Sequence, residues 1–175
     1  EDSVRDNFHK ALEELEGFAT IEEVVFPDLP YDAITRTIMI AEAVSAFDEF
    51  VDAGTMDELS APDSRYTAYP RYAVLAQDYL RALRLRGVMA RAIDEVMSRY
   101  DALISPPELA VAPPIDEENQ ARGVDVMGAV GNGAGLPSIS VPSGFSESGL
   151  PIAIQFMGRA HMENTVLALA RAYQS

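Results

Sequence analysis

Two serines near the C-terminal third are the first candidates for nucleophilic chemistry. Ser138 and Ser140 alternate with apolar residues in Ser-Ile-Ser-Val, so we expect both on one face of a strand. A serine hydroxyl attacks a carbonyl only when a neighbouring base removes its proton. The sequence offers no His, Asp or Lys at short range from this pair. We therefore interpret the two serines as strand residues without a catalytic role.

A glycine-rich segment, Gly-Asn-Gly-Ala-Gly-Leu-Pro at 131–137, is the next candidate. A dinucleotide-binding fingerprint needs a further glycine where Leu136 stands. Such a fingerprint also follows a strand, whereas this segment precedes the expected strand 138–141. The Gly-Lys-Ser or Gly-Lys-Thr of a phosphate loop does not occur in the chain. Two interpretations stay open: a backbone turn that needs positive φ and close approach, or the lining of a cleft.

Titratable residues give little support for a metal centre. His9 and Glu13 have the spacing of a surface pair on a helix, and His161 stands where a helix is expected to begin. Two isolated histidines and no cysteine do not make a zinc site, so we expect no metal and no cofactor. Asp125 is the last charge before the uncharged stretch 126–146. Its carboxylate could point into a cleft, or it could simply keep a surface loop exposed to solvent.

The charge balance excludes two classes of partner. The 175 residues include 28 Asp and Glu against 13 Lys and Arg, which gives a net charge of −15 at pH 7. Such a chain repels phosphate backbones and anionic membranes, so we expect neither nucleic acid nor membrane binding. The stretch 126–146 contains five Gly and two Pro, which argues against a transmembrane helix. We expect a cytoplasmic protein.

Hydrophobic periodicity predicts strands that alternate with long helices. The expected helices are 3–16, 33–51, 72–100 and 161–173, and the expected strands are 19–26, 101–105, 138–141 and 152–157. A Ser- and Gly-rich turn should join the last two strands. The arginines of the third helix are interpreted as a solvated face. The class is α/β, with a layered sheet flanked by helices.

Several motifs gain meaning when they are read in order. The segments are Asp-Ala-Leu-Ile-Ser-Pro at 101–106, Ala-Pro-Pro-Ile at 112–115, Asn-Gly-Ala-Gly-Leu-Pro at 132–137 and Gly-Leu-Pro-Ile-Ala-Ile-Gln-Phe-Met-Gly-Arg at 149–159. In the order of these segments and in the spacing between them, residues 101–174 resemble the later part of amidase signature enzymes. Residues 1–100 fit the same family more loosely. The resemblance covers almost the whole chain, so residues 1–175 are expected to form one C-terminal portion of an amidase signature domain.

The resemblance implies a mixed β-sheet flanked by helices and a mechanism with a serine nucleophile, a second serine in a cis peptide and a lysine. The family's Gly- and Ser-rich nucleophile signature has no match in this sequence, and the one lysine, Lys10, lies on a surface-type helix. No catalytic residue is therefore carried over. The resemblance does imply substrate-binding positions at Asp125, Asn132 and Gly133, because amidotransferase relatives use an acidic residue seven positions before that asparagine.

The resulting functional expectation is a portion of a serine-dependent amidase that hydrolyses carboxylic amides. The attacking groups would lie upstream of this chain, so the chain alone should be inactive. Its partners would be a small-molecule amide and either a second copy or the missing N-terminal part, because a truncated sheet should leave an edge or an apolar face to be covered. Two alternatives stay open: a non-catalytic assembly domain, and a fragment of a glutamine-dependent tRNA amidotransferase subunit. The region 63–66 lacks a clear counterpart of the arginine that amidotransferases pair with their acidic residue, which favours a general amidase.

Overall fold

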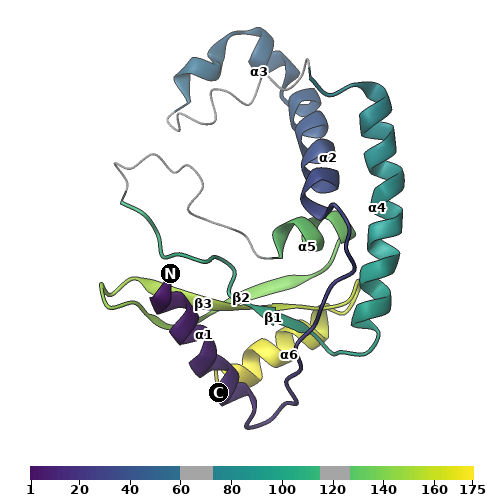
Figure 1. Cartoon of the computed structure of the whole chain (residues 1–175). Helices are drawn as coiled ribbons and strands as arrows, with labels where there is room; N and C mark the ends of the chain where they lie inside the picture. Colours follow the sequence, from purple (N-terminus) through teal and green to yellow (C-terminus); the bar gives the residue numbers. More distant parts are fainter. Residues whose placement is uncertain (60–72, 115–126) are drawn as a thin grey trace.

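The computed structural model describes residues 1–59, 73–114 and 127–175 (Figure 1). Within these ranges a small sheet lies between two sets of helices. Helices α1 (Asp2–Leu15) and α6 (Glu163–Tyr173) lie below the sheet in the view of Figure 1, α2 (Tyr31–Ala46) and α5 (Gly128–Ala134) lie above it, and α4 (Ala76–Met97) runs along its side. The α/β class with helices on both sides of the sheet is confirmed.

The sheet contains three strands in the order β1-β3-β2. Strand β3 (Pro151–Met157) is central and pairs antiparallel with β1 (Leu103–Ser105) and with β2 (Ser138–Phe145). The predicted turn joins β2 to β3, and its glycine, Gly149, has a φ of +80°. Among the described strands, β1 and β2 each have a neighbour on one side only, so they form the two edges of the sheet.

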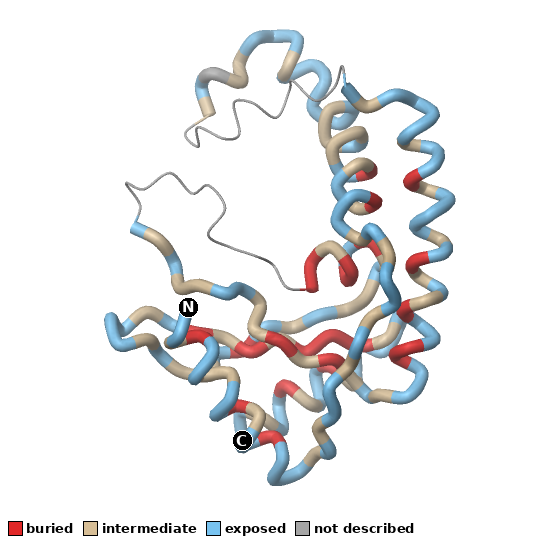
Figure 2. The backbone as a smooth tube through the Cα atoms, viewed as in Figure 1, coloured by how far each residue is buried: buried red, intermediate tan, exposed pale blue. Residues whose placement is uncertain are grey.

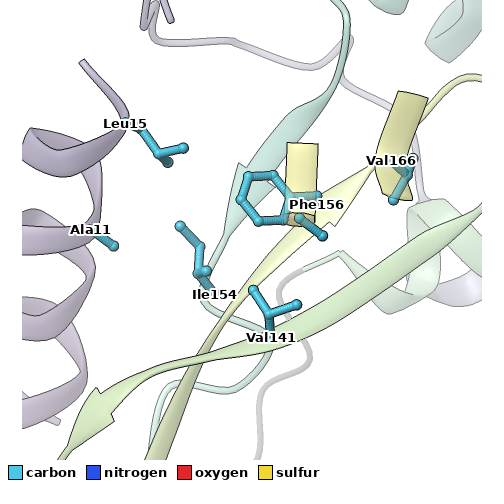
Figure 3. Close-up of a cluster of buried hydrophobic side chains, with 7 residues drawn as sticks. Ala11, Leu15, Val141, Ile154, Phe156 and Val166 are labelled. Atoms are coloured by element: carbon cyan, nitrogen blue, oxygen red, sulfur yellow. The ribbon is translucent and has the colours of Figure 1, made fainter. Parts of the chain in front are cut away.

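One face of the sheet carries the most closed part of the core. Helices α1 (Asp2–Leu15) and α6 (Glu163–Tyr173) cover it. Figure 3 shows the cluster, in which Phe156, Ile154 and Val141 of the strands meet side chains of both helices. Ile154 and Phe156, two positions apart in β3, both belong to this cluster, as the alternation of side chains along a strand requires.

The opposite face is covered at one end by a second helical layer. It consists of α2 (Tyr31–Ala46), α4 (Ala76–Met97) and α5 (Gly128–Ala134). Met97 and Ile93 of α4 join Leu103, Met157 and Val130 in a second buried cluster. A third cluster, built around Met89 and Ile38, holds α2 against α4. Arg81, Arg84 and Arg91 of α4 are exposed, as predicted for a solvated face, whereas Arg86 also donates a hydrogen bond to Gly133.

The strand expected at 19–26 is not formed. The segment is irregular and runs along the side of the molecule from α1 to α2 (Figure 1). Ile21 packs against the first cluster, whereas Val24 and Phe26 pack against the second. The β-branched composition favours extended backbone, but a strand also needs a neighbour to pair with, and Val25 is 83% exposed.

The helix expected at 33–51 is divided at Phe47. Helix α2 ends at Ala46, and a separate short helix, α3 (Asp48–Asp52), follows. Phe47 has φ −107° and ψ +22°, outside the helical range. A single turn of 3₁₀ helix, η1 (Thr55–Glu58), comes after Gly54. We refer to α3 and η1 together as the helical arm; no residue of α3 is buried (Figure 2).

Over the described residues, no helix has both the length and the apolar character needed to cross a lipid bilayer.

Candidate functional site

Helix α5 forms in the glycine-rich segment that was predicted to be a turn or a cleft lining. Glycines are poor helix formers, so packing must stabilise the helix. Met127 and Val130 are buried against the second cluster, and Figure 2 shows α5 among the most buried parts of the backbone. The predicted positive φ occurs at one position, Gly135, where the helix ends with φ +74°.

The predicted close approach is confirmed at two other glycines. A Cβ atom on Gly131 would meet the Met157 side chain, with Sδ 3.3 Å away. A Cβ on Gly133 would collide with the end of the Met89 side chain and with the Thr35 hydroxyl. The glycines therefore let α5 lie directly against β3, α4 and α2.

Two long-range hydrogen bonds hold α5 in position. The Thr35 hydroxyl of α2 donates to the carbonyl oxygen of Ala129 over 2.7 Å. The Arg86 side chain of α4 donates through Nε to the carbonyl oxygen of Gly133, also over 2.7 Å. Arg86 places its positive charge at the carboxyl end of α5, where the unpaired carbonyls favour it. Neither contact was predicted, because each joins residues far apart in the chain.

The structure describes two of the three predicted substrate-binding residues. Asn132 is exposed on α5, and Gly133 beside it is buried. Asp125 lies within 115–126, outside the described residues, and so does the region 63–66. The structure thus presents the Asn132 side chain at the surface of a fixed helix. The carboxamide of Asn132 can donate and accept hydrogen bonds, which suits recognition of another amide.

The strand serines make no hydrogen bond to a base within the described part of the chain. Ser138 and Ser140 share a face of β2, as predicted, and Gln155 of β3 lies opposite Ser140. The Gln155 side-chain amide donates to the Ser138 hydroxyl. An amide cannot take up a proton from a serine near neutral pH, so this contact fixes Gln155 without activating Ser138.

Two tyrosines near the second helical layer also stay neutral. Burial raises the pKa of Tyr31 above 10.0, and the charge of Asp28 adds to the effect. Burial also raises the pKa of Tyr79, with Glu42 acting in the same direction. Neither phenol is a base near pH 7. Among the described residues, no three His, Cys, Asp or Glu side chains gather in a way that could hold a metal ion.

Comparison with known proteins places this chain in one protein family. The sequence model of the Amidase family matches residues 1–167, so the chain belongs to the Amidase family.

Individual relatives agree with this assignment. A glutamyl-tRNA(Gln) amidotransferase subunit of Brevibacillus brevis is 38% identical over 100 residues, which is 55% of this chain and 20% of that protein. The corresponding mitochondrial subunit of Xenopus laevis is 29% identical over 183 residues, covering 87% of this chain and 35% of its own length.

Solved structures show the same fold. The corresponding subunit from Thermotoga maritima superposes with a TM-score of 0.73 at 31% identity, covering 98% of this chain and 38% of that one. The peptide amidase of Stenotrophomonas maltophilia superposes with a TM-score of 0.75 at 23% identity over 97% of this chain and 39% of its own. The chain thus spans between about a fifth and two fifths of the lengths of these four relatives.

Proposed function

We propose that this chain forms one wall of the substrate site in an enzyme that hydrolyses carboxylic amides. Support comes from the Amidase family match over residues 1–167. The single observation that carries the proposal is the fixed position of α5, which Thr35 and Arg86 hold by its backbone carbonyls while Asn132 stays exposed. Asp125, Asn132 and Gly133 are the residues proposed to lie against the substrate.

The attacking groups are proposed to lie on polypeptide outside this chain. A serine acyl-enzyme needs a nucleophile, a base and donors for the oxyanion, arranged together. Within the described residues, Ser138 has the Gln155 amide as its hydrogen-bond partner, and Lys10 is exposed on α1, on the other side of the sheet. The chain alone should therefore release no ammonia from benzamide or propionamide. Turnover by the purified chain would contradict this part of the proposal.

The binding role can be tested without catalysis. In ¹⁵N-labelled chain, titration with propionamide or benzamide should shift the amide signals of Asn132, Gly133 and Gly135 more than those of α6. Asn132→Ala should weaken that binding several-fold, because it removes the exposed carboxamide. Asn164→Ala, at an exposed asparagine of α6, is the matched control. Uniform or absent shifts would refute a substrate wall at α5.

An amidotransferase component is the second candidate. It is favoured by the 38% identity to the Brevibacillus brevis protein. In that case glutamine should shift the same signals at lower concentration than propionamide. A general amidase should show the reverse order, so one titration series distinguishes the two candidates.

A further inference from the structure

We propose that a hollow beside the α1 and α6 layer binds an amine that carries an aromatic body. The hollow lies between the end of α1, the segment 18–22, the connection 99–102 that joins α4 to β1, and helix α6. Its volume is about 420 Å³, and we call it the lower hollow. It is a second binding site, separate from the proposed substrate wall, and the inference does not rest on the proposed function.

The floor of the lower hollow is part of the closed core. Leu15 of α1 and Phe156 of β3 line it, and both are fully buried members of the cluster in Figure 3. Three partly buried residues of the lining pack against the same cluster: Ile21, Ile104 and Leu169. Because the core holds these side chains in place, the hollow is formed before a ligand arrives. A ligand therefore binds without a large cost of ordering the site.

Aromatic side chains stand at the rim above this apolar floor. Phe18 is 50% exposed, so half of its surface is open to a ligand. Tyr100 also lines the hollow, and the guanidinium of Arg99 lies over its ring, 5.5 Å from the ring centroid. Covering the exposed part of Phe18 is favourable in proportion to the apolar area removed from water, and an aromatic ligand adds a ring–ring contact. The rim therefore favours a ligand with an aromatic body.

Charge in the lining favours a cationic head group. The carboxylates of Glu22 and Asp101 line the hollow, and within the described ranges neither takes part in an ion pair or a hydrogen bond. Arg99 is the one basic residue of the described lining, and it already lies against Tyr100. A protonated amine offers three hydrogen-bond donors to the two carboxylates. An anion would instead meet a lining with excess negative charge on a chain of net charge −15.

The sheet separates the lower hollow from helix α5. Phe156 belongs to the floor of the hollow, whereas the next residue, Met157, lies against Gly131 of α5. Adjacent residues of a strand point to opposite faces of the sheet, so the two contacts lie on different sides of β3. Figure 1 shows the same arrangement, with α5 above the sheet and α1 and α6 below it. A ligand in the lower hollow therefore leaves the substrate wall at α5 free.

A matched series of ligands tests the head group. The probes are 4-phenylbutylamine, 4-phenylbutanol and 5-phenylpentanoate, which share one body and differ in charge. In ¹⁵N-labelled chain, the amine should shift the amide signals of residues 18–22 and 100–104. At low salt it should bind about fivefold more tightly than the alcohol and at least about tenfold more tightly than the carboxylate, and added salt should shrink both differences. Equal affinities, or tightest binding of the carboxylate, would overturn the proposal.

A second comparison tests the aromatic body. Propylamine carries the same charge without the ring, so it should bind at least about tenfold more weakly than 4-phenylbutylamine. If the two amines bind equally, or if the shifts are scattered over the acidic surface, binding follows the net charge alone and the proposal is wrong.

Matched variants locate the binding. The double variant Glu22→Gln/Asp101→Asn should remove the preference for the amine over the alcohol. Glu13→Gln/Glu95→Gln makes the same change of charge at exposed residues outside the hollow and should preserve that preference. A preference that both double variants keep, or that both lose, would contradict the assignment of the two carboxylates.

Phe18 is tested in the same way. Phe18→Ala should weaken all three phenyl ligands about fivefold, because it removes the aromatic contact. Phe145→Ala, at a 73% exposed phenylalanine of β2 outside the hollow, is the control and should leave binding unchanged. Both side chains are exposed, and circular dichroism checks that the variants fold. Unchanged binding in folded Phe18→Ala would contradict the proposal.

Two further measurements separate the possible outcomes. If sedimentation shows a dimer that Phe18→Ala dissociates, the lower hollow is an interface between copies and the proposal is wrong. If 4-phenylbutylamine shifts the signals of Asn132 and Gly133 instead of those of 18–22, the amine binds at α5 and the lower hollow is not its site. The propionamide titration tests the substrate wall separately, so either proposal can fail while the other stands.

Discussion

The two faces of the sheet are stabilised by different means. Below β3, the side chains of α1 and α6 close around Phe156 and Ile154 in a cluster of buried apolar residues (Figure 3). Above it, α5 is held by close backbone contact at glycines and by hydrogen bonds from Thr35 and Arg86 to its carbonyl groups. The first face depends on side-chain volume alone, whereas the second adds to its apolar cluster two glycines without side chains and two hydrogen bonds to backbone carbonyls.

This difference suits the proposed division of roles. A closely packed apolar cluster makes a stable platform, because interiors are dense and resist deformation. A helix fixed by its carbonyls leaves its outward side chains free for recognition. Asn132 can therefore be exposed at a defined position without contributing to the core. Substitutions below the sheet should lower global stability, and substitutions above it should act mainly on α5.

The largest effect is expected for Phe156→Ala. Phe156 is 1% exposed in the centre of the lower cluster, so truncation leaves a cavity and should cost about 3 to 5 kcal/mol of unfolding free energy. Urea denaturation followed by circular dichroism measures the change. Leu167→Ala, at a 55% exposed leucine of α6, is the control and should stay within about 0.5 kcal/mol. A loss for Phe156→Ala below about 1 kcal/mol would mean that the lower face is not the stable platform.

An intermediate effect is expected at the glycines of the upper face. Gly133→Ala should destabilise by about 1 to 3 kcal/mol, because its Cβ meets Met89, which is fully buried, and the hydrogen-bonded Thr35. Gly87→Ala should instead stabilise by about 0.5 to 1 kcal/mol, since it lies within helix α4 and its Cβ would have ordinary contact with Arg91. Denaturation midpoints of the two variants should thus move in opposite directions. Stabilisation by Gly133→Ala as well would show that glycine flexibility, and not close packing, governs α5.

Local patterns predicted the lower face better than the upper one. The turn between β2 and β3 was predictable because Gly149 supplies the positive φ that it needs. Helix α1 was predictable because Val4, Phe8, Leu12 and Leu15 recur at helical spacing, and Val4 and Leu15 are indeed buried. In both cases the neighbours in sequence determine the outcome.

Where tertiary packing decides, the sequence predictions were incomplete. Residues 128–134 form a helix despite three glycines, because Val130 and its neighbours pack on Met157. The apolar stripe of α2 continues through Phe47, so periodicity could not reveal the break there. In the candidate site, Asn132 and Gly133 were proposed from a family resemblance. Thr35 and Arg86 were missed, since a hydroxyl or guanidinium that bonds to a distant carbonyl leaves no local pattern.

The smallest effect, and the most specific, is expected at Thr35. Thr35→Val keeps the shape of the side chain but removes the donor to the Ala129 carbonyl, at a cost of about 1 kcal/mol. Amide hydrogen exchange in α5 should then accelerate about fivefold, because α5 opens locally at lower free energy. Exchange in β3 should not change. Thr35→Ser, which retains the hydroxyl, is the control and should keep the slow exchange of α5. If the Ser and Val variants accelerate exchange equally, the Thr35 methyl group and not its hydrogen bond holds the helix, and the upper face would then depend on side-chain volume as the lower face does.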